Sequence, residues 1–227
     1  MEIRFVHFLK QVVNMHLIHR GIVNKRYKEN LLESFNQSFK KGYGIETDIH
    51  ATKDGKFICF HDFTLKKTFK KNLSIKNLNY SKINEISSKF NKTVPLLKDL
   101  LKCSKNRYPL FIEIKPTFSK SLLAKLLKET SKFTKCVFIS FKHKNIYNLL
   151  KIKKNTKVGL SFSAPTSIKN IIKKSNCKNI NCLILDKYFI NNKRIKKIKK
   201  NKYFYTVKNK KEFMKYSKKN NLIFENL

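Results

Sequence analysis

Short runs of β-branched and aromatic residues recur along the chain, and Lys-rich stretches with helix-like spacing of apolar residues separate most of them. Eight runs have the composition of strands: residues 16–19, 44–49, 110–115, 136–141, 158–162, 182–186, 203–207 and 222–225. The segments between them are generally long enough for a crossover helix; residues 119–133, for example, repeat leucines at helical intervals. Because strands that alternate with helices pair in parallel, the pattern predicts an α/β fold, a closed (β/α)₈ TIM barrel. An open doubly wound sheet is the alternative, but no Gly-rich phosphate loop supports it.

The first residues of the chain do not fit this repeat. Residues 1–15 carry an amphipathic pattern that includes Ile3, Val6 and Val13. We expect them to form a helix that covers the bottom of the barrel, with membrane contact as the alternative. Charges interrupt the apolar residues and no small-residue cleavage site follows, so the pattern does not predict a signal peptide. No apolar run approaches the ~18 residues of a transmembrane segment, and we expect one barrel domain over residues 1–227.

Directly after Gly55, a strand-like run follows the second predicted strand too closely for a helix to intervene. Asp54-Gly55 between two extended runs is a strong signal for a two-residue hairpin turn. If these two residues form the turn, Asp48 faces His61, although a bulge would shift this register by one residue. Glu46 lies two residues before Asp48, so its side chain points to the same face. We therefore predict a β-hairpin extension after strand 2 that brings two carboxylates and an imidazole together.

The ends of the first three predicted barrel strands carry ionisable side chains. The first strand ends in His19 and Arg20, the second in Glu46 and Asp48, and the third in Glu113 and Lys115. In a barrel these ends meet at the C-terminal rim, where the chemistry takes place. Three carboxylates repel one another unless a cation lies among them, and hard oxygen ligands favour Mg²⁺ or Ca²⁺. We therefore predict that Glu46, Asp48 and Glu113 bind one divalent cation.

The other side chains of this rim suit chemistry at a phosphorus centre. Arg20 offers a planar fork for bidentate contact with a phosphate, and Lys115 adds a point charge. His19 and His61 can titrate near neutrality, as a general acid and a general base must. The sequence leaves open which histidine takes which role. We expect in-line attack on phosphorus, with the metal and Arg20 stabilising the charge that develops.

The charge of the chain is strongly positive, with 52 Lys and Arg against 14 Asp and Glu and a formal net charge of +38. The basic residues run along the whole chain, together with Asn and Ile, as AT-rich coding would produce. We therefore expect no specific nucleic-acid partner and leave weak contact with an anionic membrane surface open. The five cysteines are scattered and form no CxxC pair. This pattern indicates neither a disulfide framework nor a zinc site and favours a reducing, cytoplasmic setting.

Short motifs follow one another in a recognisable order along the chain. They are His19-Arg20-Gly21, Glu29-Asn30, Gly44-Ile45-Glu46-Thr47-Asp48, Thr52-Lys53-Asp54-Gly55, His61-Asp62, Val94-Pro95-Leu96-Leu97, Ile112-Glu113-Ile114-Lys115, Ile139-Ser140-Phe141 and Thr206-Val207. This series resembles the signature of the glycerophosphodiester phosphodiesterase family, in its short cytoplasmic form without a large inserted subdomain. The resemblance implies a (β/α)₈ barrel that hydrolyses glycerophosphodiesters, which are small-molecule substrates, to glycerol 3-phosphate and an alcohol.

The resemblance also implies roles for individual residues. It implies that Glu46, Asp48 and Glu113 bind a divalent cation. It further implies that His19 and His61 act as acid and base and that Arg20 contacts the phosphate.

The chain departs from the family pattern at the substrate end of the site. Tyr205 replaces the tryptophan expected before Thr206, and Phe224-Glu225 stands where the family has Thr-Asp. Tyr205 and Phe141 are the candidates for lining the pocket. A lysophospholipase D-type activity, a related phospholipase that stops at a cyclic phosphate, and a non-catalytic polyanion-binding barrel are the alternative functions.

Overall fold

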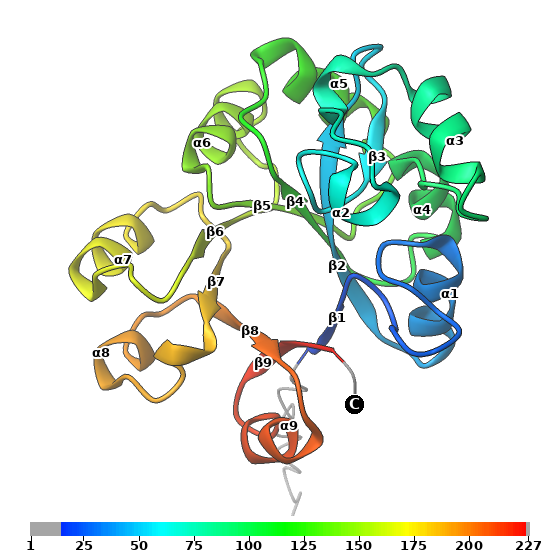
Figure 1. Cartoon of the computed structure of the whole chain (residues 1–227). Coiled ribbons are helices and arrows are strands. Elements are labelled where there is room, and N and C mark those ends of the chain that lie inside the picture. The colour runs from blue at the N-terminus through cyan, green and yellow to red at the C-terminus, as the bar shows by residue number, and fades with distance from the viewer. Residues whose placement is uncertain (1–14, 226–227) are drawn as a thin grey trace, which may run out of the picture.

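A ring of parallel strands surrounded by helices forms the centre of the protein (Figure 1). The structure is a computed structural model, which describes residues 15–225. The barrel strands are β1 (Leu17–His19), β2 (Gly44–Ala51), β4 (Leu110–Ile114), β5 (Cys136–Ser140), β6 (Val158–Phe162), β7 (Cys182–Asp186), β8 (Asn201–Val207) and β9 (Asn221–Phe224). They pair in this order, and β9 pairs in parallel with β1, which closes the sheet. The predicted (β/α)₈ barrel is therefore confirmed and the open sheet is excluded.

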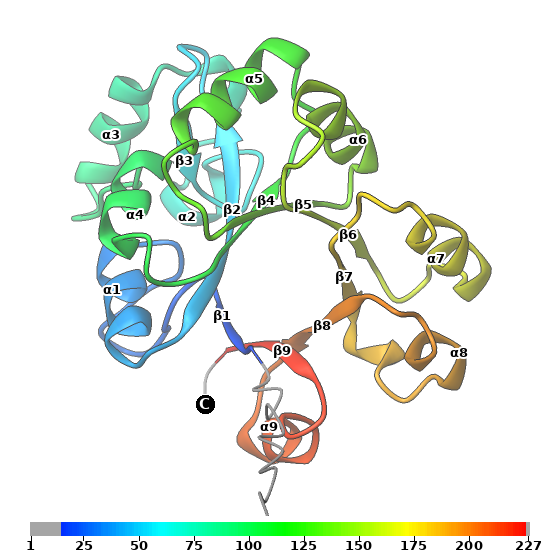
Figure 2. The same cartoon turned by 180° about the vertical axis from the view of Figure 1, so that it is seen from behind.

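Each strand-like run of the sequence corresponds to one barrel strand, and no strand end differs from the predicted one by more than two residues. The helices lie outside the ring, as the views from both ends show (Figures 1 and 2). They are α1 (Leu32–Lys40), α2 (Lys66–Phe69), α3 (Tyr80–Ser88), α4 (Leu97–Ser104), α5 (Lys120–Glu129), α6 (His143–Ile152), α7 (Ile168–Ser175), α8 (Lys193–Lys196) and α9 (Lys210–Tyr216), with 3₁₀ turns η1 (Ile75–Asn77) and η2 (Lys187–Phe189).

Helix α5 illustrates how the sequence forms these crossovers. The Ser119 hydroxyl accepts a hydrogen bond from the Leu122 N–H and caps the helix. Leu123 and Leu126 are fully buried against the sheet. Within residues 15–225, no helix combines the length and the apolar character needed to cross a bilayer. The N-terminal helix predicted for residues 1–15 lies outside the described residues except for Met15.

The barrel wall separates two apolar layers, because neighbouring residues of a strand point to opposite faces. Along β4, Leu110, Ile112 and Ile114 pack outward against the helices. Phe111 points inward and belongs to a separate cluster that fills the barrel interior. Its ring lies 4.6 Å from that of Tyr203, measured between centroids. The interior is therefore packed, and polar side chains that point inward gather at the end of the barrel.

The hairpin after β2 has a different register from the predicted one. Strand β3 (Phe57–Cys59) runs antiparallel to β2, and the Phe60 N–H donates a hydrogen bond to the Asp48 carbonyl at 3.0 Å. Asp48 therefore lies opposite Phe60, and the predicted pairing of Asp48 with His61 is wrong. The hairpin extension itself is confirmed.

The turn explains the shift by one residue. The Thr52 N–H donates to the Lys56 carbonyl at 2.9 Å, and the Gly55 N–H donates to the Thr52 carbonyl at 2.9 Å. Three residues therefore form the loop, where the sequence suggested two. Gly55 adopts a φ of 70°, the left-handed conformation that completes a three-residue hairpin loop. The additional loop residue moves every pair of the hairpin by one position.

Beyond β3, the chain forms a cap on the barrel, residues 60–96, which lies beside β2 and β3 (Figures 1 and 2). The cap has its own apolar cluster, in which Leu65, Phe69 and Ile75 are buried. The Cys59 N–H donates to the Pro95 carbonyl at 2.8 Å and ties the end of the cap to the hairpin. The apolar cluster and this hydrogen bond therefore fix the position of the cap beside β2 and β3.

We expect Gly44→Ala to lower the free energy of unfolding by about 2–3 kcal/mol, because overpacking forces the backbone to move. A Cβ at Gly44 would lie 2.4 Å from Pro109 Cγ and 2.5 Å from the Pro109 carbonyl oxygen. Urea unfolding measures the change. The matched control is Gly42→Ala, since Gly42 has a φ of 79° but no atom within 4 Å of a new Cβ. It should lose only about 1 kcal/mol; an equal loss in both variants would contradict the steric explanation.

Candidate active site

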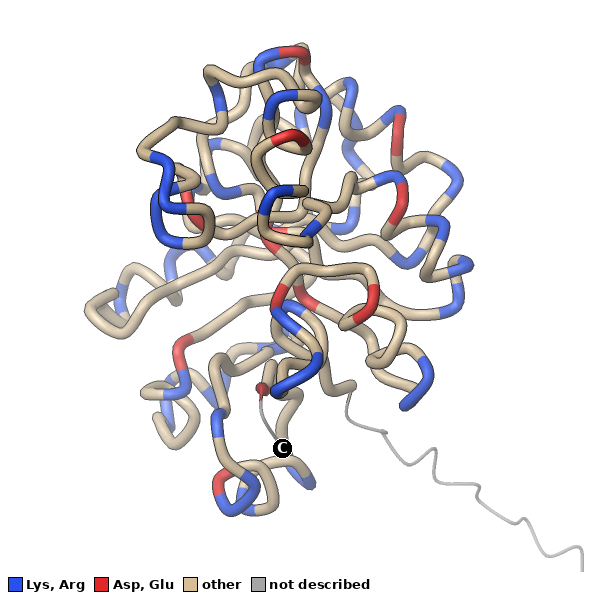
Figure 3. The backbone as a smooth tube through the Cα atoms, turned by 45° about the vertical axis from the view of Figure 1, so that its right-hand side comes forward, with Lys and Arg blue, Asp and Glu red and all other residues tan. Residues whose placement is uncertain are grey.

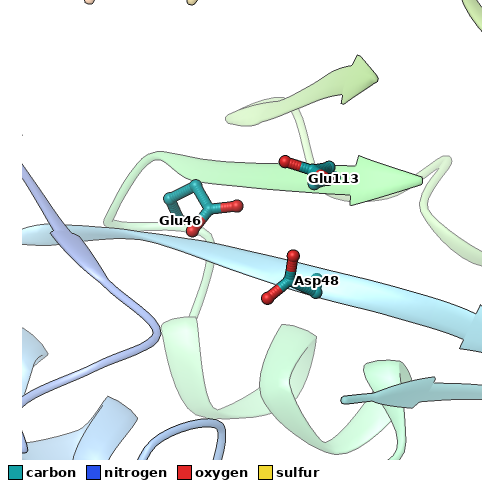
Figure 4. A group of neighbouring side chains, drawn as sticks. All are labelled: Glu46, Asp48 and Glu113. Atoms are coloured by element: carbon teal, nitrogen blue, oxygen red, sulfur yellow. The ribbon is translucent and has the colours of Figure 1, made fainter. Parts of the chain in front are cut away.

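Three carboxylates point toward one another in the mouth of the barrel (Figure 4). Glu46 and Asp48 project from β2 and Glu113 projects from β4, and the parallel register places Asp48 beside Glu113. The three residues are 3%, 1% and 8% exposed. One oxygen from each lies within 4.8 Å of the others, which is close enough for a shared metal ion. The structure therefore brings together the three carboxylates that the sequence predicts as metal ligands.

The donor set fits a divalent cation. Glu46 Oε2 and Asp48 Oδ2 are buried and have no hydrogen-bond partner among the described residues. Burial raises the pKa of Glu46 well above its usual range, and the charges of Asp48 and Glu113 add to this effect. Burial and the Asp48 charge raise the pKa of Glu113 to about 7. A hard cation with oxygen ligands would supply the missing partner and relieve the repulsion.

Two side-chain cations flank the carboxylates. Arg20 Nε lies 2.9 Å from Asp48 Oδ2, without the alignment of a hydrogen bond. Lys115 Nζ lies 3.0 Å from Glu113 Oε1 and 3.3 Å from Asp48 Oδ1. Burial alone would raise the pKa of Asp48, but Arg20 and Lys115 outweigh it, so this pKa is lowered. Asp48 is therefore the member of the triad that stays ionised most readily.

Both predicted histidines line the same cavity, which has a volume of about 190 Å³ and contains the triad, Arg20 and Lys115. His19 Nδ1 lies 3.0 Å from Glu225 Oε2, and its Nε2 lies 3.7 Å from Glu46 Oε2. His61 Nδ1 lies 2.7 Å from Asp62 Oδ1. A carboxylate thus holds Nδ1 of each ring and leaves Nε2 as the nitrogen available for proton exchange.

The backbone around β1 explains the position of Arg20. Arg20 has a φ of 57°, so the chain turns sharply where β1 ends. Its N–H donates to the Glu46 carbonyl at 2.7 Å, and its carbonyl accepts from the Asn30 N–H at 2.9 Å. The Thr47 hydroxyl donates to Asn30 Oδ1 at 2.8 Å. The loop that carries the Glu29-Asn30 motif is therefore tied to β2 directly behind the carboxylates.

His61 reaches the cavity although it does not face Asp48 across the hairpin. It lies one residue beyond Phe60, where the paired part of the hairpin ends. The buried His50 supports it, because His50 Nε2 donates to the His61 carbonyl at 3.1 Å. Burial lowers the pKa of His50 to about 4, so its ring is neutral near pH 7. Main-chain contacts therefore fix the position of the catalytic candidate His61.

An aromatic wall closes one side of the cavity. Tyr205 and Phe141 both line it, with ring centroids 5.9 Å apart in an edge-to-face arrangement. The Tyr205 hydroxyl donates to the Phe162 carbonyl at 3.1 Å. This hydrogen bond holds the ring in the wall and keeps the phenol from projecting into the cavity.

Glu225 is a site residue that the sequence analysis treated only as a departure from the family pattern. It holds His19, and Lys208 Nζ lies 3.2 Å from its Oε1. The hydrogen bond from His19 is the main reason that the pKa of Glu225 is lowered to about 2. Barrel closure could have revealed this contact, because the ends of the first and last strands of a closed barrel are neighbours.

The model of the glycerophosphoryl diester phosphodiesterase family matches residues 19–223. A relative from Mycobacterium tuberculosis, probable glycerophosphodiester phosphodiesterase 2, is 29% identical over 97 residues, which cover 42% of this chain and 37% of that protein. A glycerophosphodiester phosphodiesterase from Caldanaerobacter subterraneus subsp. tengcongensis is 26% identical over 161 residues, which cover 64% and 65% of the two chains. In both cases the matched segment spans less than two thirds of the relative's own length.

Solved structures show the same fold. A glycerophosphodiester phosphodiesterase from Thermotoga maritima has a TM-score of 0.74 at 24% identity, over 93% of this chain and 94% of that one. An Oleispira antarctica phosphodiesterase in complex with the product sn-glycerol-3-phosphate has a TM-score of 0.79 at 18% identity, over 94% and 93% of the two chains. The barrel architecture is therefore shared across nearly the full length of each chain.

In a chelating buffer, we expect the free energy of unfolding to fall between about pH 5 and about pH 8. The folded protein raises the pKa of Glu46, and that of Glu113 to about 7. Each raised pKa favours folding while the group is protonated, and this contribution is lost as the pH rises through the folded pKa. Mg²⁺ or Ca²⁺ should restore stability, by about 2.7 kcal/mol at a hundredfold excess over Kd.

Urea unfolding with and without each cation checks this prediction. The stabilisation should be larger at about pH 8 than at about pH 5, because the cation binds ionised carboxylates. Glu113→Gln should lose most of the cation effect and part of the pH dependence. A cation effect of equal size at both pH values would contradict the assignment of these carboxylates as ligands.

Proposed function

Because the chain belongs to the glycerophosphoryl diester phosphodiesterase family, we propose that it hydrolyses glycerophosphodiesters to glycerol 3-phosphate and an alcohol. Water forms a new bond to phosphorus, the bond from phosphorus to the alcohol oxygen breaks, and the alcohol leaves with a proton. The observation that carries the proposal is one cavity with three buried carboxylates, two cations and two histidines. The neighbour from Oleispira antarctica supports it, since its bound product, sn-glycerol-3-phosphate, is the product expected here.

Glu46, Asp48 and Glu113 would hold one divalent cation, Mg²⁺ or Ca²⁺. When bound, the cation supplies positive charge that stabilises the negative charge at the reacting phosphate. Arg20 and Lys115 bind phosphate oxygens from the two sides of Asp48, which both of them already contact. Fixed cations in a water-poor cavity stabilise developing charge more strongly than they would in bulk water.

His19 and His61 exchange protons with the attacking water and the leaving alcohol. Glu225 and Asp62 hold the two Nδ1 atoms, so each ring offers Nε2 and is fixed in orientation. Glu225 acts as a positioning residue, because it acts through His19. Tyr205 and Phe141 form the wall against which the glycerol part packs.

We also propose that the protein works in the cytoplasm and that residues 1–227 act as one barrel domain. The five free cysteines support a reducing setting. Lys and Arg are distributed over many elements of the chain (Figure 3), which supports the absence of a specific nucleic-acid partner.

The test is release of glycerol 3-phosphate from sn-glycero-3-phosphocholine and sn-glycero-3-phosphoglycerol, with Mg²⁺, with Ca²⁺ and with a chelator. We expect turnover with a cation and loss of turnover with the chelator. Phosphorus NMR of the product separates hydrolysis from a reaction that stops at a cyclic phosphate. Absence of glycerol 3-phosphate from every diester under all conditions would overturn the proposal.

His19→Ala and His61→Ala should each lower kcat by about 10²–10⁴-fold, the range for removal of a general acid or base. Steady-state kinetics measures the loss, and urea unfolding shows whether each variant folds. His143→Ala is the matched control, because His143 lies on α6 and stacks edge-on against Phe162. Near-normal turnover in both site variants would remove these histidines from the mechanism.

Glu225→Gln should lower kcat by about 10–100-fold, as loss of a residue that orients a functional histidine does. The double variant with His19→Ala should be no slower than His19→Ala alone, because Glu225 acts only through that ring. Additive losses in the double variant would show that Glu225 has a separate role. Glu225→Asp should recover part of the rate.

A further inference from the structure

A second cavity adjoins the active site. Its volume is about 350 Å³, against about 190 Å³ for the cavity that contains the carboxylates. His61 lines both cavities and forms the boundary between them. The second cavity lies between the loop after β1 and the cap, and buried Phe60, Phe69 and Val94 contribute its apolar surface. A substrate whose phosphorus lies in the first cavity can therefore extend past His61 into the second.

The two cavities suit the two halves of a glycerophosphodiester. The smaller one ends against the aromatic wall and the packed barrel interior, so it matches the small glycerol part that is common to all such substrates. The alcohol differs from one substrate to another and must leave after the bond breaks. The larger cavity, which opens between a loop and the cap, provides the space for it.

The charge of the second cavity indicates what kind of alcohol it binds. Lys28, Lys67 and Lys92 line it, and none of them forms an ion pair with a carboxylate of residues 15–225. Two carboxylates also line it, but both are engaged. Asp62 lies 2.7 Å from His61 Nδ1, and Glu29 lies 3.1 Å from Arg20 Nη1. Three lysines against two carboxylates leave the lining of the second cavity with an excess of positive charge.

The aromatic residues of this cavity do not attract a cationic ligand strongly enough to overcome its repulsion by the lysines. Phe60 is 8% exposed and Phe69 is 1% exposed, and their rings stack on each other with centroids 6.1 Å apart. A quaternary ammonium group needs open aromatic faces. Here the lysines that line the cavity would repel such a group and would attract a phosphate.

We infer that the second cavity is the subsite for the leaving alcohol and that it selects an alcohol carrying a second phosphate group. The inference rests on the proposed function and adds a substrate class to it. The chemistry at the scissile phosphorus is unchanged, and the second phosphate is bound by Lys28, Lys67 and Lys92 without reacting.

The test compares two substrates whose leaving alcohol is a glycerol, with and without a second phosphate on it. 1,3-Bis(sn-glycero-3-phospho)glycerol has a second phosphate on the glycerol that leaves, and sn-glycero-3-phosphoglycerol does not. We expect kcat/KM per scissile bond to be about tenfold higher for the first, since each exposed ion pair contributes roughly 1.4- to 5-fold. sn-Glycero-3-phosphocholine should be the poorest of the three, and added salt should reduce the differences.

Variants distinguish the subsite from the general charge of the protein. Lys67→Gln and Lys92→Gln should each lower the ratio of the two kcat/KM values by roughly 2- to 5-fold. Lys66→Gln is the matched control: Lys66 and Lys67 are neighbours on α2 and both are exposed, but only Lys67 lines the cavity. In Lys66→Gln, the ratio of the two kcat/KM values should stay at the wild-type value.

The outcomes separate the two proposals. Hydrolysis of sn-glycero-3-phosphoglycerol without preference for the bis-phosphodiester would overturn the subsite and leave the proposed function intact. An equal fall of the ratio in Lys66→Gln and Lys67→Gln would also overturn it, because overall charge would then explain the preference. No hydrolysis of any of the three diesters would overturn both.

Discussion

Three carboxylates lie buried within a few ångströms of one another. The repulsion among them is the constraint on which the rest of the site depends. Strands β2 and β4 place Glu46, Asp48 and Glu113 together by their register, and the burial of all three weakens the screening of their charges by solvent. Arg20 and Lys115 neutralise only part of this charge, and both contact Asp48. The two glutamates therefore carry raised pKa values, while Asp48 does not. A divalent cation would complete the balance of charge, so the same repulsion bears on the stability of the fold and on the chemistry of the site.

The barrel and the cap contribute different parts of the site. The barrel strands carry the carboxylates and His19, whose positions follow from the hydrogen bonds of the sheet. The cap follows β3 and has an apolar cluster of its own, which includes Phe60 and Phe69. It carries His61 at its first turn and forms one side of the second cavity. Substitutions in the cap can therefore alter what enters the site while the register of the three carboxylates stays fixed.

The strands and the carboxylates were predictable because both depend on local sequence. Buried parallel strands need short β-branched runs, and the strand ends identify the rim of a barrel. The hairpin register was not predictable, because Asp54-Gly55 fits a two-residue turn and a three-residue loop equally well: Gly55 can adopt a left-handed φ in either. The role of Glu225 was missed because its partner, His19, lies 206 residues away. The catalytic assignments and the helix over residues 1–15 stay predictions.

Closure of the barrel between β1 and β9 also determines when the site can form during synthesis of the chain. Protein chains emerge from the ribosome from the N-terminus onward, so His19 is made early and Glu225 is made after all the barrel strands. Until β9 pairs with β1, the sheet has two open edges and His19 has no carboxylate to orient it. The nascent chain therefore carries the three carboxylates and both histidines in an incomplete site for about half of its synthesis. The contact between His19 and Glu225 is therefore made only when the last strand closes the ring.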